Sequence, residues 1–382
     1  MTPPAGACLS RLTLTDFRCY EALRLETDAK AIVLTGPNGA GKTNVLEAIS
    51  LLTPGRGLRN AKTTEIGRKS ADGQPRRWGA AAVVDGPGGE STLGVGCDPE
   101  TQGERRKVQV DGAPARGQAA LAERFSALWL TPQMDRLFID GAEERRRYLD
   151  RLAATFDPAH IGRVSNYRNA MRQRLSLLKE GRADPTWLDA LEAEMAARAV
   201  AVAAARNETA LLLDTAAAEG VGAFPRASVI VDGTAERLLE SGPALAAEDV
   251  LRAKLAADRS RDAQLGATAT GPHRSDMVVA DRARGLRAAD GSTGEQKALL
   301  VSLTFASARM LATAKGAAPV LLLDEVAAHF DPARRAALFD EALALGGQVW
   351  VTGADEDQLR PLKGRADWRH LEAATVSDGA EQ

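Results

Sequence analysis

A glycine-rich run at residues 36–43, which reads Gly-Pro-Asn-Gly-Ala-Gly-Lys-Thr, constrains the fold of this chain more than any other feature. It fits G-x-x-x-x-G-K-[ST], a phosphate-binding loop in which glycines let backbone N–H groups converge on phosphate oxygens. The apolar run 31–34 before it and the helical spacing of apolar residues after it predict a strand, a loop and a helix in that order. That order places the positive end of a helix against the phosphates.

In such a loop Lys42 is expected to reach the β- and γ-phosphates of ATP, and Thr43 to offer its hydroxyl to Mg²⁺. The residues predicted to surround the nucleotide here are Gly36, Pro37, Asn38, Gly39, Ala40, Gly41, Lys42, Thr43 and Asn44. ATP and Mg²⁺ are therefore the cofactors we predict.

Composition limits the partners and the location of the protein. The 382 residues suffice for two domains, and a formal net charge of −2 means that any nucleic-acid surface must be a local patch. The cysteines Cys8, Cys19 and Cys97 lack metal-ligand spacing and favour a reducing cytoplasm. We see neither a signal peptide nor an apolar stretch of 18 residues, and we expect no membrane span.

Secondary-structure signals predict an α/β protein that is interrupted by helices. Strands are predicted at 9–17, 22–26, 31–35, 80–84, 92–95, 107–110, 277–281, 319–323 and 348–352, and helices at 142–154, 161–180, 186–218 and 295–314. We therefore predict an ATPase head, with a mixed sheet core and an antiparallel β layer, formed by 1–140 and 269–382. A helical arm subdomain at 141–268 is inserted into it.

The helix predicted at 186–218 allows two interpretations. Its apolar positions step by three to four residues and form a narrow seam: Leu188, Leu191, Met195, Ala199 and Val202. An ordinary buried helix of a helical subdomain is favoured, and a short coiled-coil arm is the alternative.

Two further motifs complete a nucleotide site. An apolar strand at 319–323 ends in Asp324, placed to hold Mg²⁺ through water, and Glu325, placed to polarise the attacking water. Residues 291–297 form a turn at a helix N-terminus, where Ser292 or Thr293 can cap the helix and also favour phosphate oxygen.

The order of these motifs resembles that of the ABC-type ATPases, whose signature has the form Ser-Gly-Gly-Gln. The resemblance implies that the signature of one molecule completes the ATP site of a second. The signature residues would then be Ser292, Gly294, Glu295 and Gln296. The long interval between residues 43 and 292 is typical of the SMC/Rad50-like branch, whereas a transporter head would place the two motifs far closer.

Within that branch, the chain resembles the RecF family of DNA-repair proteins over nearly its whole length. Six blocks carry the resemblance, of which Gly-Pro-His-Arg is the most distinctive: 16–20, 36–49, 52–59, 145–150, 271–276 and 292–297. It implies an ATP-dependent homodimer on double-stranded and gapped DNA, with weak ATPase and no nuclease activity. It also implies that RecR and RecO are partners that help to load RecA at single-strand gaps.

Four more site residues follow from the resemblance. Gln133 would contact Mg²⁺ and the attacking water, with a loop glutamine that has no such role as the alternative. Thr352 stands at the switch position, and Asp331 belongs to the loop after the catalytic acids. The serine usual in that loop is replaced here by Ala328, which puts a serine-mediated signal between sites in doubt. Arg18 would contact the nucleotide, with a surface arginine as the alternative.

Basic clusters are the candidate DNA contacts, although such clusters are more often solvated faces. They comprise Arg56, Arg59 and Lys62; Arg68 and Lys69; Arg76 and Arg77; and Arg105, Arg106 and Lys107. The run Arg145–Arg147 opens a helix, where cations oppose the dipole, and this predicts a partner carboxylate or phosphate. The competing function is an ABC-type ATPase with a protein partner, either a transporter head or a nuclease-associated ATPase.

Overall fold

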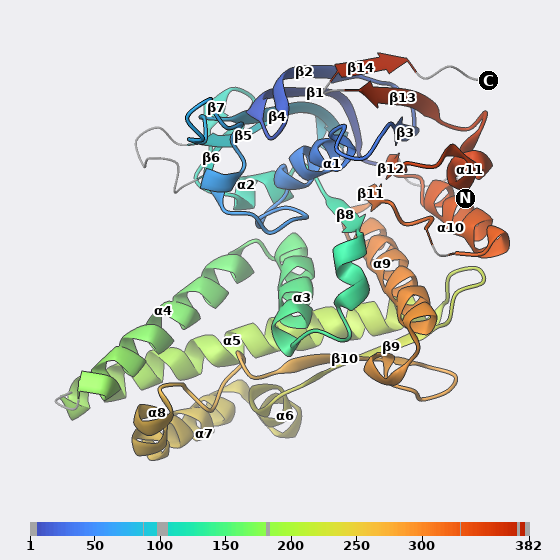
Figure 1. Ribbon diagram of the computed structural model, residues 1–382. Coiled ribbons are helices and arrows are strands. Elements are labelled where there is room, and N and C mark those ends of the chain that lie inside the picture. Colours follow the sequence, from blue (N-terminus) through green and yellow to red (C-terminus); the bar gives the residue numbers. More distant parts are fainter. Residues whose placement is uncertain are drawn as a thin grey trace. The chain divides into compact units, whose positions relative to one another are not determined.

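The computed structural model of the protein describes residues 6–86, 88–97, 106–180, 184–328, 330–372 and 375–378 (Figure 1). The chain divides into two compact units: the first contains Met1–Asp135, Gly220–Pro225 and Lys297–Gln382, and the second contains Arg136–Glu219 and Arg226–Gln296. We expected the insertion to end at residue 268. The second unit instead continues to residue 296, because a strand assigned to the head pairs with a strand of the insertion.

An antiparallel sheet forms one layer of the first unit, in the order β2-β1-β4-β5-β6-β7 (Figure 1). Its strands are β1 (Cys8–Phe17), β2 (Tyr20–Glu26), β4 (Gly79–Gly86), β5 (Gly89–Cys97), β6 (Arg106–Val110) and β7 (Ala113–Pro114). Along β1, buried Leu12 and Leu14 alternate with exposed Thr13 and Thr15, the pattern of a sheet with one covered face. The predicted antiparallel layer is confirmed.

A second sheet of the first unit carries the ends of the predicted motifs, in the order β14-β13-β3-β12-β11-β8. Its strands are β3 (Ala31–Thr35), β8 (Ala127–Leu130), β11 (Val320–Asp324), β12 (Val349–Thr352), β13 (Asp367–Glu372) and β14 (Thr375–Asp378). Strands β3, β12, β11 and β8 run parallel, and every residue in them is buried. Burial on both faces explains why these strands read as continuous apolar runs.

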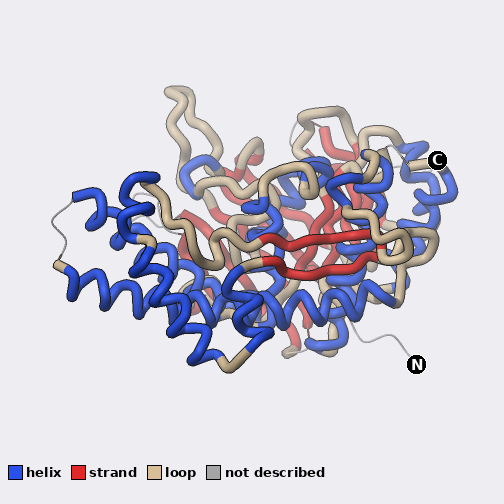
Figure 2. The backbone as a smooth tube through the Cα atoms, turned by 90° about the horizontal axis from the view of Figure 1, so that it is seen from below, coloured by secondary structure: helices blue, strands red, loops and turns tan. Residues whose placement is uncertain are grey.

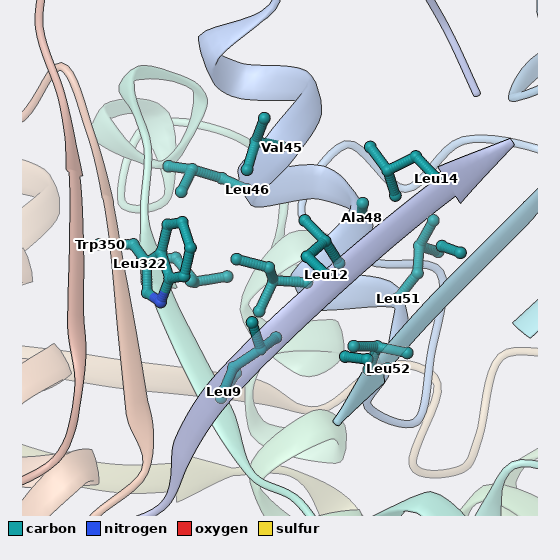
Figure 3. Packing of buried hydrophobic residues seen from close by; sticks show 14 of the residues in the cluster. Leu9, Leu12, Leu14, Val45, Leu46, Ala48, Leu51, Leu52, Leu322 and Trp350 are labelled. Carbon is teal, nitrogen blue, oxygen red and sulfur yellow. The ribbon is translucent and has the colours of Figure 1, made fainter. Parts of the chain in front are cut away.

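Helix α1 (Lys42–Leu51) contacts both sheets, because it packs against β4 of the first sheet and β8, β11 and β12 of the second. Figure 3 shows the resulting cluster, in which Leu12 of β1, Leu46 of α1 and Trp350 of β12 lie together. All three side chains are fully buried. Because this packing holds α1, it also holds the phosphate loop that leads into it.

The remaining helices of the first unit are short, apart from α9 and α10. They are α2 (Ala119–Ala122), η1 (Thr63–Glu65), η2 (Pro132–Arg136), α9 (Thr293–Lys315, which begins in the second unit), α10 (Pro332–Ala344), α11 (Glu356–Leu359) and η4 (Arg360–Leu362). Contrary to our expectation from the sequence, α9 has the length and composition of a membrane span. However, 78% of its apolar window is buried inside the protein, as in a core helix.

The second unit is built on the long helix α5, beside which the other helices and a two-stranded sheet lie (Figure 2). Its elements are α3 (Ala142–Phe156), α4 (Ala159–Glu180), α5 (Pro185–Ala218), β9 (Ala227–Asp232), α6 (Thr234–Ser241), α7 (Ala244–Ala257), α8 (Arg259–Leu265), β10 (Asp276–Asp281) and η3 (Ala288–Asp290). The seam residues Leu191, Met195 and Ala199 of α5 are buried in a cluster with residues of α4, α6 and α7. This packing favours the buried-helix interpretation over a coiled-coil arm.

The expectation of a purely helical arm was wrong. Strand β10 was predicted as part of the head, but it pairs antiparallel with β9, with Met277 opposite Val231 and Val279 opposite Val229. All four of these side chains are buried, whereas Ile230 on the other face of β9 is 61% exposed. We missed β9 because a six-residue alternating run between long helices is a weak signal.

The distinctive block at 271–276 is part of the core of the second unit. Gly271 has φ 138°, and a Cβ there would lie 2.1 Å from Tyr167 Oη. His273 hydrogen-bonds Tyr167 Oη through Nδ1 and the Thr268 carbonyl through Nε2, both at 2.8 Å. Burial lowers the pKa of His273 to about 4, so the ring is neutral at pH 7. This block therefore supports the strand β10 that follows it.

Buried ion pairs tie the helices of the second unit together. Arg174 of α4 is fully buried and donates to Glu192 of α5 at 2.8 Å, to Asp262 of α8 at 2.7 Å and to the Leu255 carbonyl at 2.7 Å. Removing one partner from such a cluster leaves the others as uncompensated buried charges, which is strongly destabilising.

We predict that Arg174→Met lowers the free energy of unfolding by about 3–5 kcal/mol, because it leaves Glu192 and Asp262 buried without their cation. Urea titration followed by circular dichroism measures the change. The matched control is Arg172→Met, an exposed arginine on the same helix, which should change stability by less than about 0.5 kcal/mol. Equal stabilities of the two variants would contradict a role for this cluster.

Candidate nucleotide-binding site

The loop at 36–43 has the backbone that a phosphate cradle needs. Gly36, Gly39 and Gly41 have φ values of 135°, 85° and 106°, a region that side chains other than glycine rarely adopt. A Cβ on Gly36 would lie 2.2 Å from the Leu371 carbonyl oxygen, and one on Gly41 would lie 2.5 Å from Tyr20 Oη. Conformation therefore favours glycine at all three positions, and space also requires it at Gly36 and Gly41. The loop fits a polyphosphate at the N-terminus of α1.

Backbone carbonyl groups of the phosphate loop hold the Lys42 ammonium group in place. Its Nζ donates to the carbonyl oxygens of Gly36 at 2.7 Å and Pro37 at 3.0 Å, and the residue is only 5% exposed. Burial lowers the pKa of Lys42, while the carboxylates of Glu325 and Asp324 oppose that shift. The ammonium group is thus close to both acids, as the prediction of a shared phosphate and metal site requires.

Asp324 is the point where three elements meet. Its Oδ1 accepts hydrogen bonds from Thr43 Oγ1 at 2.8 Å and from Thr352 Oγ1 at 2.7 Å. Thr43 lies in the first turn of α1, Asp324 ends β11, and Thr352 ends β12, directly opposite Asp324 in the parallel register. A hydroxyl and a carboxylate oxygen side by side form a donor set that suits Mg²⁺, which prefers oxygen ligands. The structure thus brings together the two predicted metal ligands Thr43 and Asp324.

Glu325, the predicted general base, has an unusual backbone conformation. Its φ is 49°, and its N–H points back to Thr352, at 3.1 Å from Oγ1 and 3.2 Å from the carbonyl oxygen. A left-handed conformation at a non-glycine residue is costly and persists only where surrounding contacts enforce it. Here it leaves the Glu325 side chain exposed beyond the strand end, where a water could be polarised.

Thr352, predicted among the catalytic residues, is fully buried, and its hydroxyl hydrogen-bonds Asp324 Oδ1 and the Glu325 N–H. It therefore orients the predicted metal ligand Asp324 together with the predicted general base Glu325. A catalytic role of its own stays a prediction.

The other predicted residues of the first unit lie around this centre. Gln133 is exposed in η2, just after β8, whose end pairs with β11 through Leu130 and Leu323. Asp331 caps α10 and accepts from the Arg334 N–H at 2.9 Å, which is a helix-capping role. Its function toward a nucleotide stays a prediction.

Arg18 and the missed residue Glu47 form one cluster. Glu47 of α1 is fully buried and accepts from Arg18 Nε at 2.8 Å and from Arg18 Nη2 at 2.5 Å. It also accepts from Arg59 Nη1 at 3.1 Å, and Arg59 contacts Asn44 Oδ1 at 2.7 Å. The sequence signal was available, because an acid among the apolar positions of a helix needs a cation. The Arg18 guanidinium is thus paired with the Glu47 carboxylate, and its contact with nucleotide stays a prediction.

The predicted signature opens α9, in the second unit. Ser292 and Glu295 form a capping box: Glu295 Oε2 accepts from the Ser292 N–H and hydroxyl, both at 2.8 Å. Gly294 faces open space, whereas Gln296 is 4% exposed and donates to the Gly291 carbonyl at 3.0 Å. Ser292 is therefore the cap, and the Gln296 amide nitrogen fixes the preceding turn. The contact of Gln296 with a nucleotide stays a prediction.

The candidate DNA contacts differ in how free they are. Exposed positions are Arg56, Lys62, Lys69, Arg76, Arg77 and Lys107, whereas Arg105 lies outside the described residues. Arg76 pairs with Asp16 at 3.4 Å, and Arg68 is half-buried with Asp16 at 3.0 Å and Glu21 at 2.9 Å.

Arg106 and the run Arg145–Arg147 face protein groups. Arg106 is half-buried and donates to the Thr53 carbonyl at 3.2 Å, and burial lowers the pKa of Arg106 to about 10. Arg106 is thus poorly placed for a phosphate. Arg145 pairs with Asp276 at 2.7 Å, which is the carboxylate partner predicted for the helix start.

Comparisons with known proteins agree with this fold. A family model described as RecF/RecN/SMC N terminal domain matches residues 8–363. The chain is 46% identical over 378 residues to the DNA replication and repair protein RecF of Rhizobium etli (strain CIAT 652), covering 98% of this chain and 99% of that protein. It is 44% identical over 376 residues to the protein of that name from Rhizobium meliloti (strain 1021), covering 98% and 100%.

Solved structures show the same fold. The structure of the recombination mediator protein RecF-ATPrS in the RecFOR pathway matches with a TM-score of 0.86 at 21% identity, covering 100% of both chains. The Smc head domain from Pyrococcus furiosus, bound to the C-terminal domain of ScpA, matches with a TM-score of 0.52 at 15% identity, covering 97% and 95%.

The fold, the phosphate loop and the paired acids define an ABC-type ATPase head of the kind found in SMC proteins. Within that class, the chain belongs to the RecF family, whose members named above are DNA replication and repair proteins. The expected fold class and family are confirmed, and the transporter-head and nuclease-associated alternatives are not favoured.

We predict that Thr352→Val lowers the maximal rate of ATP hydrolysis about tenfold, roughly the worth of one buried hydrogen bond between Thr352 and Asp324. Affinity for ATP should change little, because the phosphate loop keeps its contacts. Phosphate release and titration with a fluorescent ATP analogue measure the two quantities. Thr352→Ser keeps the hydroxyl and is the control; a valine variant with the wild-type rate would contradict the positioning role.

Proposed function

We propose that this protein is an ATP-operated clamp on DNA that acts in recombinational repair. The observation that carries the proposal is the convergence of two hydroxyls, from Thr43 and Thr352, on one carboxylate, that of Asp324 at the end of β11. That arrangement supports Mg²⁺–ATP binding by the phosphate loop, and a structure of the recombination mediator protein RecF-ATP, which has the same fold, supports the choice of nucleotide. Glu325 then activates water for a slow, DNA-dependent hydrolysis.

The clamp closes when two chains enclose two ATP molecules. In each site Lys42, Thr43 and Asp324 come from one chain, and Ser292 and Gly294 come from the other. Supporting this division, Gly294 leaves bare backbone at the N-terminus of a 23-residue helix, where a helix dipole and N–H groups attract phosphate. Gln133 would complete the metal site in the closed state.

Closure holds double-stranded or gapped DNA against the exposed basic residues of the first unit. The exposed candidates are Arg56, Lys62, Lys69, Arg76, Arg77 and Lys107. Arg59 bridges that surface to the nucleotide site, because it contacts Asn44 directly after the phosphate loop. Hydrolysis releases the DNA.

In the cell we place this cycle in the cytoplasm, at single-strand gaps, together with RecR and RecO and ahead of RecA loading. The name of a related structure, a recombination mediator of the RecFOR pathway, supports these partners. The protein itself would cut no DNA.

Glu325→Gln is expected to trap a closed, ATP-bound dimer, because the amide keeps the shape of the base but cannot accept the proton from water. Light scattering after gel filtration measures the mass with and without Mg²⁺–ATP. The control is Lys42→Ala in the same background, which should remain monomeric because it loses the phosphate-binding cation. A Glu325→Gln protein that stays monomeric with ATP contradicts the two-chain site.

DNA retention by the trapped dimer should depend on ATP and fall steeply with salt. Neutralising several phosphates predicts a loss of affinity of at least about tenfold between 50 and 200 mM salt, with little sequence preference. Filter binding with duplex, gapped and single-stranded DNA, comparing wild type with Lys42→Ala, tests this. If ATP promotes no retention of any of these DNAs, an ATPase with a protein partner is favoured instead. Retention that does not change with salt would contradict binding through the phosphates.

A further inference from the structure

A turn after β10 presents one arginine to the signature. Asp281 Oδ1 accepts from the N–H groups of Ala283 at 2.9 Å and Arg284 at 3.2 Å, and Gly285 with φ 66° completes the turn. These bonds fix the backbone of Arg284, whose guanidinium pairs with Glu295 in the first turn of α9. Both side chains are well exposed, at 55% and 40%.

Glu295 is shared between this arginine and the signature serine. One carboxylate oxygen, Oε1, accepts from Arg284, and the other, Oε2, accepts from the Ser292 hydroxyl at 2.8 Å. A serine hydroxyl has a single donor. While Ser292 donates to Glu295, it cannot donate to a phosphate, so the carboxylate and an incoming anion compete for the same proton.

The negative charge of Glu295 also opposes the binding of an anion at the signature. The hydrogen bond from Arg284, together with those from Ser292, lowers the pKa of Glu295 to about 2, so the carboxylate is ionised at pH 7. A negative charge in the first turn suits the helix dipole, but it repels a phosphate that approaches the same turn. Arg284 supplies the nearest opposite charge.

We propose that Arg284 is a positioning residue of the signature, which neutralises Glu295 and loosens its hold on Ser292 so that a second chain's ATP phosphate can bind there. This inference rests on the proposed two-chain site. Arg284 does not touch the phosphate; it acts through Glu295. In the closed state the Ser292 hydroxyl turns from the carboxylate to the phosphate, while the Arg284–Glu295 pair remains.

The test measures ATP-dependent dimerisation by light scattering in the Glu325→Gln background, at a series of Mg²⁺–ATP concentrations. Arg284→Ala should raise the ATP concentration for half-maximal dimer roughly fivefold, the effect of one uncompensated charge a few ångström away in largely aqueous surroundings. Adding Glu295→Gln to Arg284→Ala should restore the wild-type midpoint, because no charge then needs neutralising. Arg252→Ala, which removes an equally exposed paired arginine on α7, should leave the midpoint unchanged.

The outcomes separate this inference from the proposal on which it rests. If the parent Glu325→Gln protein does not dimerise with ATP, the two-chain site is wrong, and the role of Arg284 falls with it. If the parent dimerises and Arg284→Ala has the same midpoint, the role of Arg284 alone is overturned. It is also overturned if the double variant stays as weak as Arg284→Ala, because the effect then does not pass through Glu295. Unchanged melting temperatures show that the variants are folded.

Discussion

The carboxylate of Asp324 is the group on which the nucleotide site depends. Two hydroxyls, from Thr43 at the start of α1 and Thr352 at the end of β12, converge on one of its oxygens. Each donor comes from a different part of the chain, so the site exists only when the parallel sheet is in register and α1 is packed on it. Close packing of the fully buried strands against the apolar face of α1 fixes this register. The same packing therefore fixes the positions of the Thr43 and Thr352 hydroxyls and of the Asp324 carboxylate oxygen.

The two units are stabilised by different interactions. In the first, Leu12, Leu46 and Trp350 belong to a continuous apolar cluster between two sheets and a helix. In the second, the helices are rich in alanine, and buried ion pairs hold them together. Arg174 forms one such cluster, and Asp150 with Arg206, at 2.8 Å, forms another. Burial alone would raise the pKa of Asp150, but Arg206 and His160 lower it below its usual range. Such pairs require each partner in place, which favours a single arrangement of the helices.

Much of the fold could be predicted because its strands are buried on both faces or alternate cleanly. The limits of β3 and the helix at 185–218 agree with the sequence almost to the residue. The pairing of β9 with β10 could not be predicted, although the strand at 277–281 was. Pairing between residues 227 and 281 is a long-range event, and β9 leaves only a short alternating run in the sequence. For the same reason Arg59 and Arg106 were grouped with surface arginines, although their guanidinium groups turn toward Glu47 and the Thr53 carbonyl.

The sequence alone determined the class of chemistry, because a phosphate loop needs glycine at set positions and a cation and hydroxyl after it, all within eight residues. It also determined the order of the acids and the signature, since each motif is local. Only the tertiary structure decided what those residues do to one another. Thr352 is buried and orients two acids, Glu47 binds two arginines, and Arg284 pairs with Glu295. All of these contacts join segments that are separated in the sequence or connected by a turn. Such contacts are fixed by tertiary packing, which cannot be inferred from any short segment of the sequence.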